Sequence, residues 1–289
     1  MKINKKSAVF MAILAAALYA LSSPISKLLL TKVSATTMAG LLYLGAGIGL
    51  SVVRLVQKQM KIVNREKSLT REDLPYTIGM VVLDIAAPIC LMFGLTMTTA
   101  ANASLLNNFE IVATSLIALF IFKEKISKRL WAAITLVTLA SIILTVEDSS
   151  SFRFSFGSLF VLLACVCWGF ENNCTRKISD KDPLQIVVIK GFGSGLGSLL
   201  IAFVIGERLP GFRYILCAML LGFVAYGLSI FFYIYAQRTL GAAKTSTYYA
   251  VAPFIGAALS LIIFHEIPAV SFWIALVIMA AGAYLASTD

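Results

Sequence analysis

The chain has 289 residues, of which 60% are hydrophobic and 13% are charged, and its mean hydropathy is +0.91. Soluble domains are about 45–50% apolar and about 25% charged, so this composition predicts an integral membrane protein and argues against soluble enzymes and disordered chains. The net charge of +10 does not require a nucleic-acid partner, because Lys and Arg in a multi-pass protein fix its orientation.

Apolar runs between charged segments predict ten membrane-spanning helices, since a helix needs about 20 apolar residues to cross a bilayer. No run shows the period-two alternation of a membrane β-barrel strand. The first run follows three lysines, and with nine further spans it is interpreted as an uncleaved helix. In chain order the spans are expected near residues 7–30, 34–56, 75–97, 100–122, 128–146, 155–175, 183–206, 213–236, 241–264 and 269–287.

The distribution of basic residues predicts the orientation. Ten spans place both termini on one side, and most of the 24 Lys and Arg residues fall in segments on that side. Basic residues concentrate in cytoplasmic loops of membrane proteins. We therefore expect a multi-pass protein of the cell (inner, cytoplasmic) membrane, with both termini in the cytoplasm.

The two halves of the chain match each other. Residues 19–23 align with 168–172 at a shift of 149, and glycines 45, 47 and 49 align with 193, 195 and 197 at a shift of 148. Near the ends of the halves, 122–124 aligns with 264–266 at a shift of 142. Five spans per half would orient the halves oppositely, an architecture that recurs in transporters with a midplane substrate site. We expect two inverted-topology five-helix repeats, residues 1–147 and 148–289, in an all-α fold.

Several of these segments resemble the tandem EamA domains of the drug/metabolite transporter (DMT) superfamily. The similar features are Trp168-Gly169, the run 100–106 and the Phe-x-Glu ends at Glu124 and Glu266. The resemblance covers essentially the whole chain and implies ten helices around a central substrate cavity with alternating access. The first half departs from the pattern of the second, with Ile111 opposite Pro253 and Tyr19-Ala20 opposite Trp168-Gly169. Members export or import amino acids, other metabolites and drugs, so the resemblance does not name a substrate.

Four charged residues fall in the middle of expected spans: Asp84, Glu110, Glu171 and Lys190. A charge at the bilayer centre costs about 2.5–3.5 kcal/mol, so such residues face a cavity or a partner. If all four are ionised, their sum is −2. This sum favours binding of a cation or of protons over binding of an anion.

Positions i, i+3, i+4 and i+7 share one helix face, and in the sixth span these positions form a polar stripe of Trp168, Glu171, Asn172 and Thr175. The equivalent face of the first span consists of Tyr19, Ser22, Ser23 and Ser26. Two such stripes facing each other would form the walls of a polar cavity; the alternative is that these groups only join packed helices by hydrogen bonds. Aromatic faces such as that of Tyr249 would suit a cationic group. The predicted substrate-binding residues are Glu171, Asn172, Trp168, Tyr19, Ser22, Asn107 and Tyr249.

Glu110 shares a polar stripe with Asn107 and Thr114, and its counterpart in the second half is an alanine. Desolvation would allow this carboxyl group to bind and release protons, so we predict a coupling role. A structural ion pair with Lys190 is the alternative. Asp84 lies four residues before Pro88 and is assigned to the same coupling or charge-pair group, with pairing to backbone groups freed by the proline as its alternative.

The remaining signals are interpreted as structural. Glu124 and Glu266, at opposite membrane faces, are expected to form ion pairs or gates. The glycines in the second and seventh spans lack the context of a nucleotide-binding loop and predict close helix packing. Five cysteines without CxxC spacing and a single histidine predict no metal site, and no Walker A motif is present, so no cofactor is expected.

The sequence thus predicts a secondary active transporter of small organic cations or zwitterions, such as amino acids or amines, with proton coupling. An uncoupled facilitator is the first alternative, and a membrane-embedded enzyme or receptor subunit is a remote one. The expected partners are a small-molecule substrate, protons and the lipid bilayer, with no nucleic acid. Substrate identity, transport direction and the choice between monomer and homodimer stay open.

Overall fold

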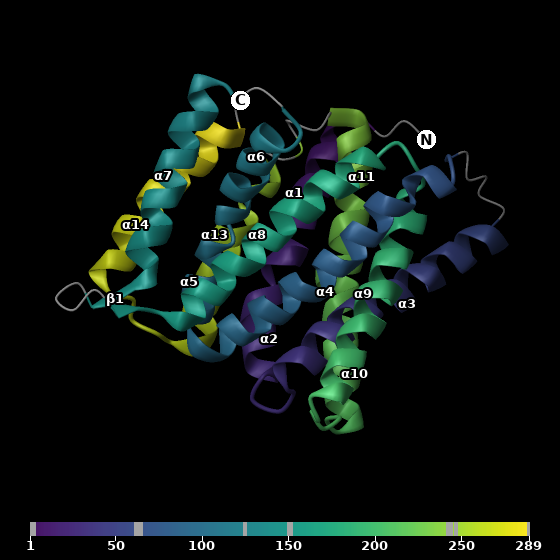
Figure 1. Cartoon of the computed structure of the whole chain (residues 1–289), viewed down its shortest axis with the longest axis horizontal. Helices are drawn as coiled ribbons and strands as arrows, with labels where there is room; N and C mark the ends of the chain where they lie inside the picture. Colours follow the sequence, from purple (N-terminus) through teal and green to yellow (C-terminus); the bar gives the residue numbers. More distant parts are fainter. Residues whose placement is uncertain are drawn as a thin grey trace.

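The computed structural model describes residues 4–60, 66–123, 126–148, 153–240, 245 and 248–287, and most of them are helical (Figure 1). A short 3-10 turn, η1 (Arg71–Asp73), precedes α4. The helices of the first half are α1 (Lys5–Ala20), α2 (Ser22–Leu29), α3 (Ala35–Gln59), α4 (Leu74–Met97), α5 (Ala100–Leu106), α6 (Phe109–Phe120) and α7 (Lys128–Thr145).

A two-stranded antiparallel ribbon, β1 (Val146–Asp148) and β2 (Arg153–Phe154), joins α7 to the second half. The π-helical turn η2 (Phe223–Leu228) interrupts the eighth expected span. The helices of the second half are α8 (Phe156–Lys177), α9 (Pro183–Val204), α10 (Phe212–Gly222), α11 (Ser229–Leu240), α13 (Ala252–Phe264) and α14 (Val270–Ser287).

The multi-pass helical prediction is confirmed. Among the described residues, eight helical segments are long and apolar enough to cross a membrane, and two shorter apolar helices cover 252–264 and 270–286. The ninth span was expected from residue 241, but 241–244 and 246–247 lie outside the described residues. The count of ten spans and the inverted arrangement stay predictions.

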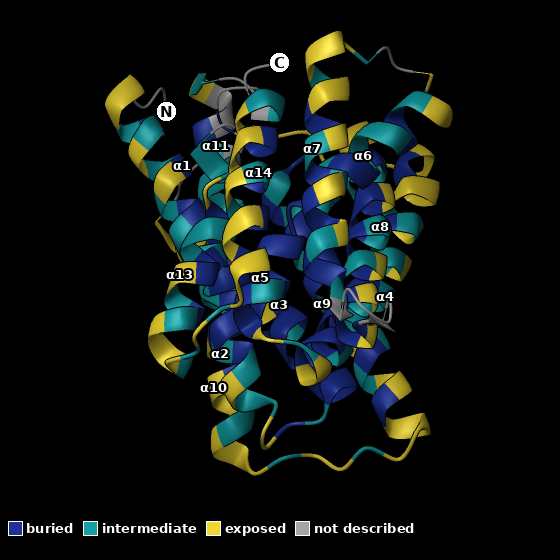
Figure 2. Ribbon diagram, turned by 90° about the vertical axis from the view of Figure 1, so that its left-hand side faces the viewer, coloured by how far each residue is buried: buried dark blue, intermediate teal, exposed yellow. Residues whose placement is uncertain are grey.

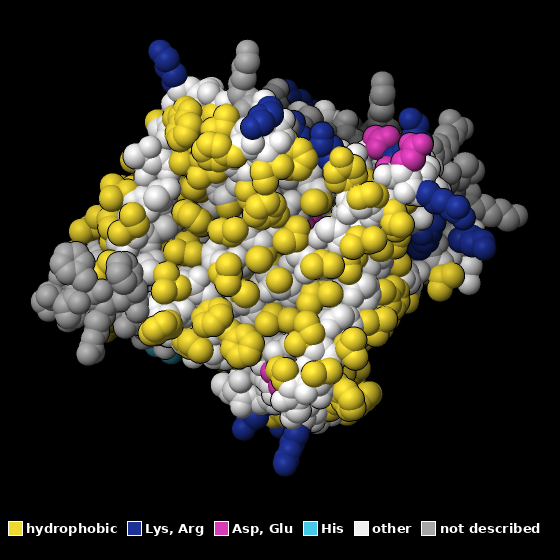
Figure 3. All heavy atoms as spheres, in the orientation of Figure 1, with side chains coloured by type: hydrophobic (Ala, Val, Ile, Leu, Met, Phe, Trp, Pro, Cys, Tyr) yellow, Lys and Arg dark blue, Asp and Glu magenta, His cyan; other side chains and the backbone are white. Residues whose placement is uncertain are grey.

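The face of the molecule shown in Figure 3 has the apolar surface that a bilayer requires. On the face in Figure 3, hydrophobic side chains cover the middle of the molecule, and charged side chains gather toward its two ends. Phe203, for example, is 80% exposed. Buried residues occupy the centre of the bundle in Figure 2, where both termini lie at the same end. A soluble protein would not expose so continuous an apolar surface.

The core forms between the two halves of the chain. α4 packs along α8, α3 along α9, α7 along α14, and α1 along α11 and α13. Each of these pairs takes one helix from each half, so the halves interlock instead of forming separate bodies.

Glycines allow α3 to approach its neighbours closely. A Cβ atom built on Gly191 of α9 would lie 2.5 Å from Gly47 Cα, and one built on Gly45 would lie 2.0 Å from the Met219 carbonyl oxygen of α10. Only glycine fits such backbone contacts. The geometry agrees with the predicted packing role of these glycines.

Two further expected spans are interrupted, in addition to the eighth. The first breaks at Leu21 between α1 and α2, where Pro24 lacks the N–H that would bond to the Ala20 carbonyl. The fourth breaks at Asn107-Asn108 between α5 and α6. Asn favours such local turns because its side chain competes for backbone hydrogen bonds; here Asn108 Nδ2 donates to the Leu105 carbonyl at 3.1 Å.

Candidate functional site

Three of the four membrane-embedded charges form one cluster. Lys190 of α9 places its Nζ atom 2.7 Å from Glu171 Oε1 of α8 and 3.1 Å from Asp84 Oδ2 of α4. All three residues are buried, with Asp84 fully so. One ammonium group therefore serves two carboxylates, and the cluster carries one negative charge when all three are ionised.

Hydroxyl groups complete this cluster. Tyr43 of α3 donates to Asp84 Oδ1 at 2.9 Å, and Thr175 donates to Glu171 Oε1. The Asp84 carboxylate thus engages Tyr43 and Lys190, so the alternative that it serves backbone groups freed by Pro88 is wrong. Its helix turns the carboxylate toward α3 and α9 instead.

Glu110 forms a second polar centre on α6. Asn172 Nδ2 donates to Glu110 Oε1 at 2.6 Å and lies 3.3 Å from Thr114 Oγ1. Among the described residues, no Lys or Arg forms a salt bridge with Glu110. The ion pair with Lys190, the alternative for Glu110, is not formed because Glu171 and Asp84 take that ammonium group.

Helix α8 connects the two centres. Glu171 points toward α9, whereas Asn172, the next residue, points toward α6. The stripe expected on α8 therefore divides between two neighbouring helices. Neighbouring helical positions lie about 100° apart, so one helix can serve two sites at the same depth.

Tyrosines extend the site toward the other half of the bundle. The centroid of the Tyr19 ring lies 5.9 Å from the centroid of the Tyr226 ring and 5.8 Å from that of the Tyr249 ring. Ser22 donates to the Tyr226 hydroxyl at 3.0 Å. The Tyr226 ring lies 5.3 Å from Tyr43, so the predicted residues of α1 and α2 reach Asp84 through two further tyrosines.

Sequence reasoning missed Tyr43. It lies in a glycine-rich apolar helix and is only 4% exposed. A buried tyrosine hydroxyl needs a hydrogen-bond partner, and this requirement is the signal that would have pointed to it. The predicted residue Trp168 is 6% exposed and lies on α8 one turn before Glu171 and Asn172.

Asn107 is adjacent to Glu110, whose amide donates to the Asn107 carbonyl at 3.1 Å, but it lines a cavity that Glu110 does not line. This small cavity of about 10 Å³ lies at the interruptions of the first and fourth spans. The structure therefore does not bring all predicted binding residues into one pocket. The residues around this cavity are Tyr19, Ala20, Ser23, Ser104, Asn107, Ala252, Pro253 and Gly256.

Of the two predicted gate residues, the structure describes Glu266, which lies away from these centres. Glu266 follows α13 and lies within electrostatic range of Lys27, whose Nζ donates to the Leu95 carbonyl and, at 2.8 Å, to the Thr98 carbonyl. Glu124 lies outside the described residues. Glu207 caps the same end of the bundle by accepting from the Thr37 amide at 2.7 Å.

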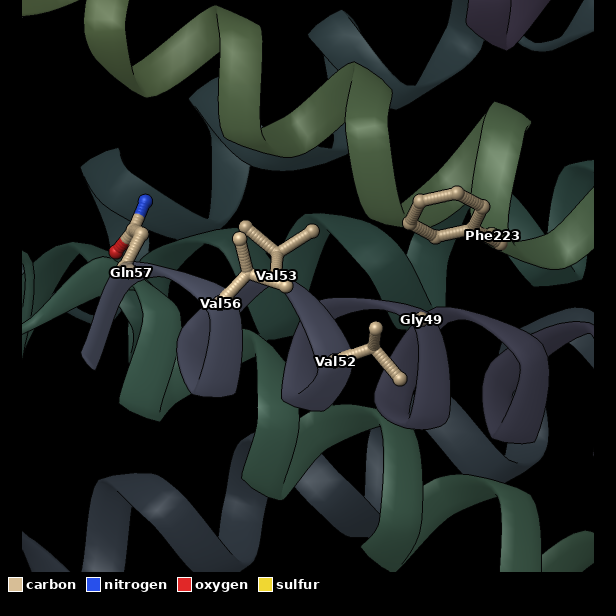
Figure 4. Close-up of a pocket in the computed structure, with 6 residues that line it drawn as sticks. All are labelled: Gly49, Val52, Val53, Val56, Gln57 and Phe223. Carbon is tan, nitrogen blue, oxygen red and sulfur yellow. The ribbon is translucent and has the colours of Figure 1, made fainter. Parts of the chain in front are cut away.

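A separate groove beside α3 is apolar. It has a volume of about 410 Å³ and opens beside α3, where Phe223 of η2 faces the valines of α3 (Figure 4). None of the membrane-embedded charges lines it, so the charge cluster and Glu110 form the candidate site. The residues that line the apolar groove are Gly49, Val52, Val53, Val56, Gln57 and Phe223.

Comparisons with known proteins place the chain among transporters. The model of the EamA-like transporter family matches residues 6–146 and 155–288. An uncharacterized transporter of Methanothermobacter thermautotrophicus is 26% identical over 284 residues, covering 92% of this chain and 82% of the relative. One of Clostridium kluyveri is also 26% identical, covering 79% and 76%. A solved crystal structure at 15% identity shares the fold, with a TM-score of 0.69 over 98% of this chain and 97% of the other.

Proposed function

Because the chain belongs to the EamA-like transporter family and is a membrane transporter, we propose that it moves a small organic cation or zwitterion, such as an amino acid or an amine. The observation that carries this proposal is the charge balance of the site. Lys190 is shared by Asp84 and Glu171, and Glu110 has no basic partner among the described residues. A cationic substrate group or a proton would supply the missing positive charge.

The same balance supports proton coupling. A carboxylate taken out of water needs a compensating charge or a proton, because an unpaired buried ion is strongly disfavoured. A proton and the cationic group of a substrate would therefore compete for Glu110. The titratable or charged side chains that act on Glu110 from the surrounding elements are Glu171, Lys190, Tyr19, Tyr249 and Cys165.

Substrate contacts are proposed at the predicted residues that surround Glu110. Asn172 fixes the Glu110 carboxylate by a hydrogen bond of 2.6 Å. Tyr19 and Tyr249 offer aromatic faces suited to a cationic group, with Ser22 and Trp168 at the edges of the same network. Glu171 belongs to the cluster with Asp84 and Lys190 that carries one negative charge, so it would attract the cationic group of the substrate.

Inverted repeats are supported by the packing. Helix α3 packs on α9, and α7 packs on α14; in each pair the two helices hold corresponding places in the two halves. The contact of α4 with α8 corresponds to the contact of α11 with α1, with the two halves exchanged. The family model matches once on each side of the β1–β2 ribbon. We therefore keep the division into repeats 1–147 and 148–289, with alternating access between them.

The burial pattern favours access from the end of the bundle where both termini lie. Between Glu171 and that end of the bundle, the α8 residues Asn172 and Thr175 are half-buried. Glu110 and Thr114 of α6 are half-buried as well. Toward the other end, Ser22, Ser26 and Ser104 are buried. Together with the predicted cytoplasmic termini in the cell membrane, this arrangement corresponds to an inward-facing state.

The test is electrical recording from proteoliposomes on a solid-supported membrane. Amino acids, amines, quaternary ammonium compounds and neutral metabolites are applied in turn, with and without a pH gradient. We expect currents that require one class of cationic or zwitterionic solute and that change with the proton gradient. Radiolabelled uptake without any pH dependence would instead establish an uncoupled facilitator, and uptake of neutral or anionic solutes alone would contradict the substrate class.

A further inference from the structure

Helices α3 and α9 join the two halves of the chain through a close backbone contact in the bundle (Figure 2). A Cβ atom built on Gly191 of α9 would lie 2.5 Å from Gly47 Cα of α3. A second close contact lies further along the pair, because a Cβ atom on Gly195 would lie 2.7 Å from the Leu44 amide nitrogen. Backbones packed this tightly cannot slide past each other without a shift of a whole helix.

At the end of the bundle away from the termini, a carboxylate that follows α9 caps α3. Thr37 donates to Glu207 Oε2 through its amide and its hydroxyl group, both at 2.7 Å, and the Thr36 amide donates to Oε1 at 3.2 Å. The Glu207 amide donates to the Ala202 carbonyl of α9 at 2.9 Å, so the cap is anchored to α9. A carboxylate at a helix amino terminus forms charge-assisted hydrogen bonds and interacts favourably with the helix dipole.

At the opposite end, the residue that caps α9 is connected to α3. Asp182 accepts from the Leu184 amide at 3.0 Å, and its Oδ2 atom lies 3.7 Å from Arg54 Nη2 of α3. Arg54 is about half exposed, so this ion pair adds little by itself. The backbone adds a second link, because the Asp182 amide donates to the Lys67 carbonyl at 2.7 Å and Lys67 forms an isolated β-bridge with Lys181.

The connection between α3 and α4 supports this second link. Thr70 donates to Asp73 Oδ2 through its amide and its hydroxyl group, both at 2.8 Å, and Lys181 Nζ lies 3.4 Å from the same oxygen. The Leu69 amide donates to Gln185 Oε1 of α9 at 3.0 Å. The first half is therefore joined to the start of α9 by α3 itself and by the connection that follows α3.

We propose that α3 and α9 form a seam that stays closed at both membrane faces throughout the transport cycle, so that the two repeats pivot about it. The seam consists of the glycine contacts, the Glu207 cap and the links of Asp182 and Lys181. The inference rests on the proposed alternating access between the repeats. Helices that part at one face lose their contacts there, whereas this pair has polar contacts at both faces and backbone contacts between them.

The change of access then takes place at another contact between the halves. The contact of α6 with α8 has the required features, because Asn172 and Glu110 meet there and are half-buried toward one end of the bundle. Near that end, Lys177 Nζ at the end of α8 lies 5.3 Å from the centroid of the Phe122 ring, which follows α6. We expect this contact to open and close while the seam does not.

Reversible cross-linking of the full-length protein in proteoliposomes tests the seam. Lys67→Cys with Lys181→Cys places two thiols on the β-bridge of the seam, and Phe122→Cys with Lys177→Cys places two beside α6 and α8. A short bis-methanethiosulfonate reagent links each pair, and a reductant removes the link. Uptake of a mixture of radiolabelled amino acids is measured in the same protein before linking, after linking and after reduction. Single-cysteine variants control for reaction of the reagent with one thiol or with the native cysteines.

Uptake should stay within twofold of the unlinked level when the seam is linked. It should fall at least tenfold when α6 is linked to α8, and it should recover on reduction. Uptake that is lost with the seam linked, or that survives both links, would overturn the proposal. No uptake in the unlinked proteins would count against the proposed substrate class instead, and the seam is then decided by a measurement without substrate.

That measurement is hydrogen exchange of the wild-type protein, followed by mass spectrometry. Amides exchange when the structure around them opens locally, so a contact that stays closed protects them. Amides 40–50 of α3 and 187–197 of α9 should exchange more slowly than amides 110–118 of α6. Exchange in either seam segment as fast as in α6 would overturn the proposal.

Discussion

Glu171 and Asn172 are consecutive residues of α8 that serve different charge centres. Glu171 Oε1 lies 2.7 Å from Lys190 Nζ, whereas Asn172 Nδ2 donates to Glu110 Oε1 at 2.6 Å. Any movement of α8 relative to α6 or α9 must change at least one of these contacts. The helix thus couples the charge cluster of Asp84, Glu171 and Lys190 to the Glu110 carboxylate, which has no basic partner among the described residues.

Substitution of Glu171 should separate transport from folding. In Glu171→Gln, Lys190 keeps Asp84 at 3.1 Å, so the fold should persist. Coupled flux should be lost, because the amide no longer holds the ammonium group by charge. Flux is measured by radiolabelled uptake into proteoliposomes, and folding by the elution profile on size exclusion. Wild-type flux in a folded Glu171→Gln protein would remove Glu171 from the site.

Substitution of Lys190 should damage stability instead. Lys190→Met leaves Asp84 and Glu171 buried without their cation, and breaking a buried pair costs about 3–5 kcal/mol. A lower unfolding midpoint in detergent is expected. The triple variant Lys190→Met, Asp84→Asn, Glu171→Gln should recover much of the loss, since it removes all three charges. A single variant as stable as the wild type would show that the cluster is not an ion pair in solution.

Asn172→Ala should weaken substrate binding. The variant removes a hydrogen bond to a charged group, worth about 1.5–3 kcal/mol, so KM should rise about tenfold or more. Asn102→Ala is the control, because Asn102 is half-buried in α5 and lines neither charge centre. Initial uptake rates over a substrate series measure both. A KM within twofold of the wild type in Asn172→Ala would exclude Asn172 from positioning Glu110.

Gly191→Ala should loosen the contact between α3 and α9. The added Cβ would lie 2.5 Å from Gly47 Cα, and overpacking of this kind costs about 1–3 kcal/mol. Gly211→Ala is the control, because its Cβ would meet only Tyr214, at 3.8 Å. The unfolding midpoint should fall for Gly191→Ala alone. Equal midpoints for the two variants would contradict the close packing.

Periodicity and hydropathy predicted the helices well. The seventh span was expected at 183–206, and α9 covers Pro183–Val204. The breaks at Leu21 and at Asn107-Asn108 were not predicted, although Pro24 and the adjacent asparagines are local signals for them. Hydropathy averages over a window about as long as a span, so it does not detect an interruption of one or two residues.

The charged residues were predicted, but their pairing was not. Which carboxylates contact Lys190 depends on the rotation of α4, α8 and α9 about their axes, and the packing of the whole bundle sets this rotation. For the same reason the α8 stripe was placed on a single face. Tyr43 was missed because its importance arises only from its contact with Asp84 on a neighbouring helix.

The central claim is that a proton and a cationic substrate group compete for Glu110. The most direct test compares substrate-induced currents of the wild type and Glu110→Gln across a pH series on solid-supported membranes, with the exposed Glu72→Gln as control. The account predicts pH-dependent currents in the wild type and in Glu72→Gln. Glu110→Gln should show small currents that do not change with pH. The same pH dependence in all three proteins would contradict the account.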